Sequence, residues 1–240
     1  MLSRHAVTVR GAHKAASAAV AQPVEKVSKT STGLTVATIE ASGPLTQLVL
    51  AFRAGTRYEG AGNAGLVHTV RNFVGRDTKE YFGTNIVWAA AAAGGVIRSF
   101  ATRDVFGVAL TVPRDSISSG LAVLGQAAAL PGFKPWEIED VLPTIRADNG
   151  YRTPYDYVID GIHRAAYRNG GLGNSVFAPC SRIGTISSQA LDKFADTHFV
   201  TGNGILFAIN ANHEDVARYG DSYAPITGGN AVSTQSSPYK

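Results

Sequence analysis

The chain has 240 residues, of which 45% are hydrophobic and 17% are charged, and its 22 basic and 18 acidic side chains give a net charge of +4. This length fits one large or two small domains with a sizeable core, and the composition excludes a disordered or fibrous protein. A single cysteine, Cys180, excludes an internal disulfide and argues against a thiolate zinc site.

The first 22 residues differ in composition from the rest of the chain. They contain Arg4, Arg10 and Lys14 but no acidic residue. Basic residues among Ser and Ala, without a following apolar core, are typical of a mitochondrial transit peptide rather than a secretory signal. The sequence therefore predicts a transit peptide over residues 1–22, with a disordered basic tail as the alternative. Because most of the net charge lies here, no nucleic-acid partner is expected.

The first half of the remaining chain alternates between strand and helix patterns. β-branched and alternating segments favour strands, and apolar residues at i, i+3 and i+4 favour helices. Asn63 is the expected N-cap of the first helix, and Gly94-Gly95 ends the second. In chain order, we expect strands over 34–40 and 47–54, helices over 63–74 and 79–93, and a hairpin of strands over 96–102 and 105–112.

The second half is mainly helical. Pro143 and Pro154 predict a kink or a division of the longest helical segment. In chain order, we expect helices over 116–130 and 135–167, a helix capped by Ser187 and running to Phe199, a strand over 204–210, a helix from His213, and an unstructured linker over 221–240. This order predicts an α+β domain over residues 23–220, in which helices pack on one face of a mostly antiparallel sheet. No segment has the roughly 20 apolar residues of a membrane span.

Most catalytic motifs are missing from the sequence. It contains no P-loop, no dinucleotide-binding glycine motif and no nucleophile elbow. His163, His198 and His213 have no second ligand at a useful spacing, so we interpret them as surface or packing residues. His68 differs, because Arg71 and Asn72 follow it on the same helical face. This is the spacing of the inverted zinc motif H-x-x-E-H, of which only the first histidine is present.

Three tracts carry a family resemblance that extends from about residue 29 to 219. They are LAFRAGTRYEGAGNAGLVH, the hairpin GG-x-I-x-S-x-x-T-R-D, and HRAAYRNGGLGNSVFAPCSRIGTISSQALDKFADTHF. They resemble the amino-terminal half of the pitrilysin-like (insulinase-type) metallopeptidases. Within this family, AAYRN, RIG and S-x-x-L-x-x-F-x-x-x-H-F are most similar to core subunits of the mitochondrial ubiquinol-cytochrome c reductase, the second core subunit above all. The resemblance implies a pitrilysin-like (LuxS/metallohydrolase-like) fold.

The resemblance also assigns the positions of the family's metal site. His68 matches the first zinc histidine, Arg71 the catalytic glutamate, Asn72 the second histidine and Arg146 the third ligand. Two permanent cations repel a divalent ion, and one imidazole is too few ligands for zinc. We therefore expect no metal, no cofactor and no peptidase activity of the chain by itself. A polar helix face that contacts carboxylates elsewhere is a better interpretation of His68, Arg71 and Asn72 than a residual ligand role.

The implied function is structural. Core subunits of this kind lie on the matrix side of the mitochondrial inner membrane and support electron transport from ubiquinol to cytochrome c without a small-molecule substrate of their own. The implied partners are the other core subunit and the cytochrome b-containing subunits. Two alternatives stay open: the non-catalytic, substrate-recognising subunit of the mitochondrial processing peptidase, and a leader-peptide-binding domain. The family has two similar halves, so a truncated isoform or a fragment is also an open interpretation.

Overall fold

A six-stranded mixed sheet forms the base of the fold. The computed structural model describes residues 23–60, 62–168 and 171–233, so the predicted transit peptide and residues 234–240 lie outside the described part. The strands lie in the order β1-β2-β6-β3-β5-β4, and all neighbours are antiparallel except β2 and β6. Their bounds are Val24–Lys29 for β1, Thr35–Glu40 for β2, Leu45–Phe52 for β3, Val96–Ala101 for β4, Phe106–Pro113 for β5 and Gly204–Ile209 for β6.

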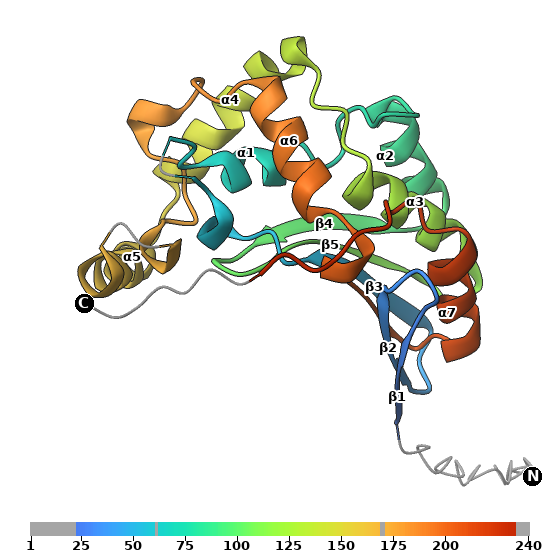
Figure 1. The fold of residues 1–240 in the computed structure, drawn as a ribbon. Coiled ribbons are helices and arrows are strands. Elements are labelled where there is room, and N and C mark those ends of the chain that lie inside the picture. Colours follow the sequence, from blue (N-terminus) through green and yellow to red (C-terminus); the bar gives the residue numbers. More distant parts are fainter. Residues whose placement is uncertain (1–22, 61, 169–170, 234–240) are drawn as a thin grey trace, which may run out of the picture.

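All helices except α5 lie on one side of this sheet (Figure 1). Their bounds are Leu66–Asn72 for α1, Gly83–Ala92 for α2, Ile117–Ala129 for α3, Pro135–Gly150 for α4, Pro154–Tyr167 for α5, Ser188–His198 for α6 and His213–Ser222 for α7. The predicted α+β class is confirmed. The long predicted helix divides as expected, because Pro154 begins α5 and Thr153 closes a capping box with Asp156.

The core lies between the sheet and the helices. Alternate residues of the central strands, such as Leu48 and Leu50 of β3 and Val108 of β5, are fully or almost fully buried. They share one hydrophobic cluster with Leu121 and Leu124 of α3. At one end of the sheet, Phe199 stacks on Phe52 and Phe106 with ring centroids 4.9 and 5.3 Å apart. The end of α6 is therefore fixed to β3 and β5 by aromatic packing.

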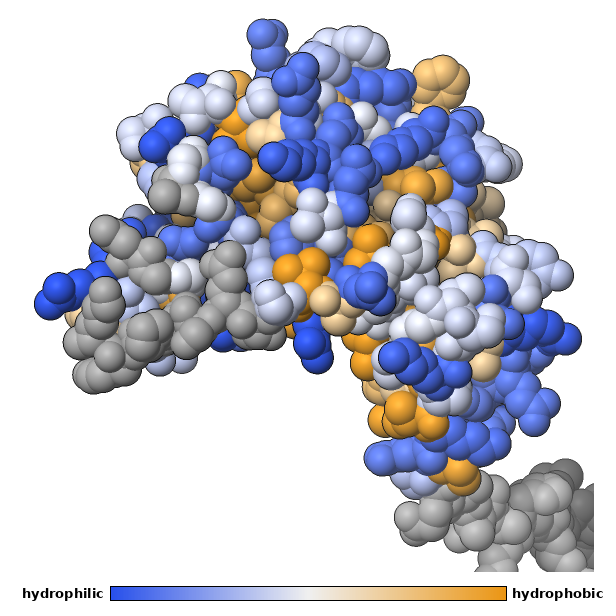
Figure 2. All heavy atoms as spheres, viewed as in Figure 1, coloured by the Kyte–Doolittle hydropathy of each residue, from blue (hydrophilic) through white to orange (hydrophobic). Residues whose placement is uncertain are grey.

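Helix α5 differs from the other helices. None of its residues is buried, and Tyr155, Val158 and Ile162 are exposed. In Figure 1 it lies beyond the end of the sheet rather than over its face. In the same view, Figure 2 shows a largely hydrophilic surface with separate apolar patches. Within the described part of the chain, no helix is both long enough and apolar enough to cross a bilayer.

Three local expectations are wrong. Strand β1 was not expected, because its charged, mostly exposed sequence VEKVSK lacks a buried face. Helix α2 begins at Gly83 rather than at residue 79, since Thr78 closes a turn with Tyr81 before it. The predicted unstructured linker starts too early at residue 221, because α7 ends at Ser222. Residues 223–233 contain no helix or strand, but Thr227 and Gly229 accept backbone hydrogen bonds from the segment before β6.

Candidate functional site

Three of the four residues singled out on the family motif, all of them on α1, meet one carboxylate of α4. His68 has a completely buried side chain, and its Nε2 lies 3.0 Å from Oδ2 of Asp148 in α4. Arg71 and Asn72 donate to the same carboxylate oxygen, Asn72 through Nδ2 at 3.2 Å. One carboxylate of α4 therefore holds three side chains on one face of α1. This agrees with the expected polar face that contacts carboxylates elsewhere.

Arg146, the expected occupant of the third ligand position, is not part of this cluster. Its side chain is exposed, whereas Asp148 faces His68. Two residues along a helix turn the side chain by about 200°, so Arg146 and Asp148 point to opposite faces of α4. Asp148 was not predicted from the sequence, because its contact with His68 joins two helices that are far apart in the sequence.

The loop before Cys180 closes the other side of His68. The backbone N–H of Ala178 donates to Nδ1 of His68 at 3.0 Å. The Phe177 ring meets the imidazole edge to face, with centroids 5.5 Å apart. Both imidazole nitrogens are therefore engaged by the protein itself.

The charges of the cluster follow from its surroundings. Burial lowers the pKa of His68, the charges of Arg71 and Arg152 lower it further, and the contact with Asp148 only partly opposes them. Burial acts to raise the pKa of Asp148, but hydrogen bonds from His68 and Asn72 and the charge of Arg71 together bring it below its ordinary value. At neutral pH the cluster therefore contains a carboxylate, a guanidinium and an uncharged imidazole.

These residues do not fit the zinc ion of a metallopeptidase. Within the described residues, no three His, Cys, Asp or Glu side chains are grouped to hold a metal. The cluster offers one imidazole and one carboxylate, and Arg71 already occupies the carboxylate oxygen. A catalytic zinc needs three protein ligands and a base for its water. Neither requirement is met here.

A second ion cluster, of side chains mostly shielded from solvent, lies beside the first. Asp160 of α5 binds Arg103 of the β4–β5 turn at 2.6 Å, and it also accepts hydrogen bonds from Arg152 and Ser175. The guanidinium of Arg152 is 4.5 Å from the ring centroid of Phe177, which contacts His68. A cavity of about 510 Å³ lies between the two clusters, with Arg71 and Asp160 in its wall. No residue pattern predicts this cluster, because its members come from four separate segments.

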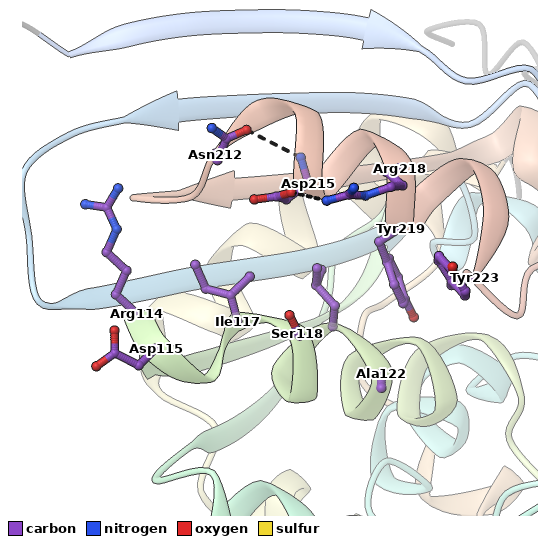
Figure 3. A pocket seen from close by; sticks show the side chains of 11 residues that line it. Arg114, Asp115, Ile117, Ser118, Ala122, Asn212, Asp215, Arg218, Tyr219 and Tyr223 are labelled. Atoms are coloured by element: carbon purple, nitrogen blue, oxygen red, sulfur yellow. Dashed lines mark hydrogen bonds and ion pairs between the residues drawn. The ribbon is translucent and has the colours of Figure 1, made fainter.

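A larger cavity, of about 710 Å³, lies far from these clusters in the fold, between α3 and α7 (Figure 3). Arg218 and Asp215 form an ion pair on its α7 side, and Asn212 caps that helix. None of its lining residues belongs to the His68 or Asp160 cluster. We therefore place the candidate site at His68 and not in the larger cavity.

Glu59 fixes the start of α1, where Asn63 was the expected cap. Its carboxylate accepts hydrogen bonds from the backbone N–H groups of Gly65 at 3.1 Å and Val67 at 2.8 Å. Gly65, at the N-cap position, has a φ of 91°, a left-handed conformation that suits glycine. The helix that carries His68 therefore depends on a buried carboxylate several residues upstream.

This carboxylate predicts a pH effect on stability. Burial raises the pKa of Glu59 from 4.5 to about 7, although its two backbone hydrogen bonds oppose the shift. Between these values the folded chain keeps a proton that the unfolded chain releases, so the contribution of Glu59 to stability falls as pH rises and levels off above about 7. Glu59→Gln cannot titrate. Relative to this variant, the wild type should therefore lose up to about 3 kcal/mol of unfolding free energy between about pH 5 and pH 8.

Urea unfolding of both proteins at several pH values measures this difference. Glu40→Gln is a matched control, because Glu40 is only loosely paired with Arg114 at 3.8 Å on the surface. If the difference in unfolding free energy between the wild type and Glu59→Gln stays constant with pH, the raised pKa of Glu59 is contradicted.

Comparisons with known proteins point to the same family as the H-x-x-E-H-like spacing of His68, Arg71 and Asn72. Residues 35–180 match the family model described as Insulinase (Peptidase family M16). The cytochrome b-c1 complex subunit 2, mitochondrial, of Homo sapiens is 28% identical over 210 residues, which are 87% of this chain and 46% of that protein. The probable mitochondrial-processing peptidase subunit alpha-2 of Arabidopsis thaliana is 24% identical over 188 residues, 78% of this chain and 38% of that protein. The chain spans less than half the length of both relatives.

The fold is also found among solved structures. A peptidase M16 inactive domain from Pseudomonas fluorescens superposes with a TM-score of 0.78 at 17% identity, covering 90% of this chain and 54% of that chain. At this identity the likeness concerns the fold alone. The family model, by contrast, matches more than half of the chain and includes α1 with His68. The chain therefore belongs to the insulinase family, peptidase family M16.

Proposed function

We propose that the chain is a non-catalytic structural subunit of the mitochondrial ubiquinol-cytochrome c reductase, of the second core type. The observation that carries the proposal is the ion cluster in which Arg71 and Asn72 bind Asp148. By the motif resemblance, these two residues stand where the family has its base and its second histidine. Such a site has no means of activating water. A role in assembly rather than in chemistry is what this geometry supports.

The proposed setting follows from the relatives. The human relative is named as a mitochondrial cytochrome b-c1 complex subunit. We place this chain in the same kind of assembly, on the matrix side of the inner membrane, with the other core subunit and the cytochrome b-containing subunits as partners. Residues 1–22 would serve as the transit peptide that directs the chain there.

Native electrophoresis of mitochondrial membranes tests this assignment. An antibody against the chain should detect it in the band that contains cytochrome b and the iron-sulfur subunit. If the chain is found instead in a matrix heterodimer that cleaves leader peptides, the proposal is contradicted. That result would favour the processing-peptidase alternative, which the similarity to the Arabidopsis relative supports. In a parallel assay, the purified chain should cleave no leader peptide, with or without added zinc.

A further inference from the structure

The hydrogen bond on Nδ1 of His68 sets the position of the imidazole proton. A backbone N–H can only donate, so the Ala178 N–H requires an unprotonated Nδ1. The single proton of the neutral ring is then on Nε2, which donates to Asp148 Oδ2 at 3.0 Å. Metal-binding histidines show the opposite polarity, since their second ring nitrogen almost always donates a proton to a carbonyl or carboxylate. In His68, the nitrogen that faces the cluster has no free lone pair for a metal.

Arg71 adds a second obstacle to metal binding. Its Nη2 lies 3.1 Å from Nε2 of His68 and also donates to Oδ2 of Asp148. Because Nε2 carries a proton, the two nitrogens are both donors, and they share the carboxylate rather than bind each other. The guanidinium therefore lies against the two groups that a metal would need to bridge. Asn72 completes the arrangement with its own bond to the same oxygen.

We propose that this site is a metal-free cross-link in which Arg71 supplies the positive charge that a metal ion supplies in a working peptidase, and Ala178 holds His68 in the tautomer that cannot bind one. The two obstacles are independent, so restoring the family's motif residues does not by itself regenerate a tight zinc site. The cross-link joins α1, α4 and the 177–178 segment within one chain. It does not depend on assembly into a larger complex, so its failure and the failure of the proposed function are distinguishable.

Nitrogen-15 NMR of the histidine-labelled chain tests the tautomer directly. His68→Gln identifies the His68 signals by their loss. We expect an unprotonated Nδ1 and a protonated Nε2 in the folded protein. The opposite tautomer, or a mixture dominated by it, would overturn the role assigned to Ala178.

Zinc titration of repaired variants tests both obstacles. The double variant Arg71→Glu/Asn72→His restores H-x-x-E-H, with Asp148 as the available third ligand. Adding Ala178→Pro deletes the amide proton, and the residue before Pro179 is already biased toward the extended backbone that proline can adopt. We expect no stoichiometric zinc on the wild type, weak binding by the double variant, and binding about 10–100-fold tighter by the triple variant.

Three results would overturn the inference. They are equal zinc affinities of the double and triple variants, no zinc binding by either variant when circular dichroism shows that both are folded, and stoichiometric zinc on the wild type. If the triple variant does not fold, the NMR measurement still decides the tautomer.

The charge of Arg71 is tested separately by thermal unfolding. Arg71→Lys should keep a higher Tm than Arg71→Met, while the control Arg76→Met, at an exposed arginine 3.7 Å from Asp140, should leave the Tm unchanged.

Discussion

Replacing Asp160 by alanine is expected to lower the free energy of unfolding by about 3–5 kcal/mol, because two cations that are mostly shielded from solvent lose their shared partner. The side chain of Asp160 is 12% exposed, and those of Arg103 and Arg152 are 14% exposed. Neither guanidinium can lose its charge, so each remains in a poorly solvated place without compensation. Urea unfolding of the purified chain, followed by circular dichroism, measures the loss.

Two further variants separate this effect from a general loss of packing. Asp160→Asn keeps the shape and some hydrogen bonds, so its effect should lie between those of wild type and alanine. Asp215→Ala removes an acid that is 59% exposed and pairs with Arg218 within one helix turn, so its effect should stay within about 1 kcal/mol. A similar small loss for Asp160→Ala would show that the Asp160 cluster does not stabilise the attachment of α5.

Phe199→Ala should cost about 3–5 kcal/mol of unfolding free energy, because it leaves a cavity among three packed rings. Phe199 is almost fully buried and stacks on Phe52 of β3 and Phe106 of β5. The loss includes both the buried ring surface and the two stacking contacts. Thermal and urea unfolding should show it as a lower midpoint with an unchanged dependence on denaturant.

Phe199→Leu is the informative companion variant, since it keeps an apolar side chain and should cost clearly less than alanine. Trp88→Ala serves as the surface control, because Trp88 is 74% exposed and should change stability by no more than about 0.5 kcal/mol. Equal losses for Phe199→Ala and Phe199→Leu would contradict this expectation, because they would mean that the retained apolar volume contributes little and that the ring stack accounts for the loss.

Local patterns were sufficient to predict much of the fold. Alternation located β3 and β5, and Ser187 was recognised as the N-cap of α6, where its side chain accepts from Ala190 N–H. Gly94 has the left-handed φ of 69° that its place after α2 predicted. These features depend on residues close in sequence. Strand β1 was missed because it is an edge strand that gains order from pairing with β2 rather than from a buried face of its own.

Only the part of the site that lies on α1 could be predicted from the sequence. The spacing of His68, Arg71 and Asn72 placed them on one face of α1, and the structure shows that face. Their partner Asp148 is in another helix, and the amide that engages His68 belongs to Ala178, whose side chain carries no chemical signal. Backbone donors and contacts between distant segments leave no trace in a residue pattern. The polarity of the His68 hydrogen bonds therefore required the structure.

The position of β6 has a consequence for how the chain reaches its native state. The last strand lies between β2 and β3, and Thr35 pairs with Ile205 from the far end of the domain. Until β6 is present, no strand joins the β1–β2 pair to the β3–β5–β4 part of the sheet. The apolar faces of these two parts therefore cannot form one continuous surface for the helices. Closure of so long a loop is slow compared with the pairing of neighbouring strands. Folding should therefore be completed late, after almost the whole domain has left the ribosome or crossed a membrane, and the two part-sheets need protection from aggregation until then.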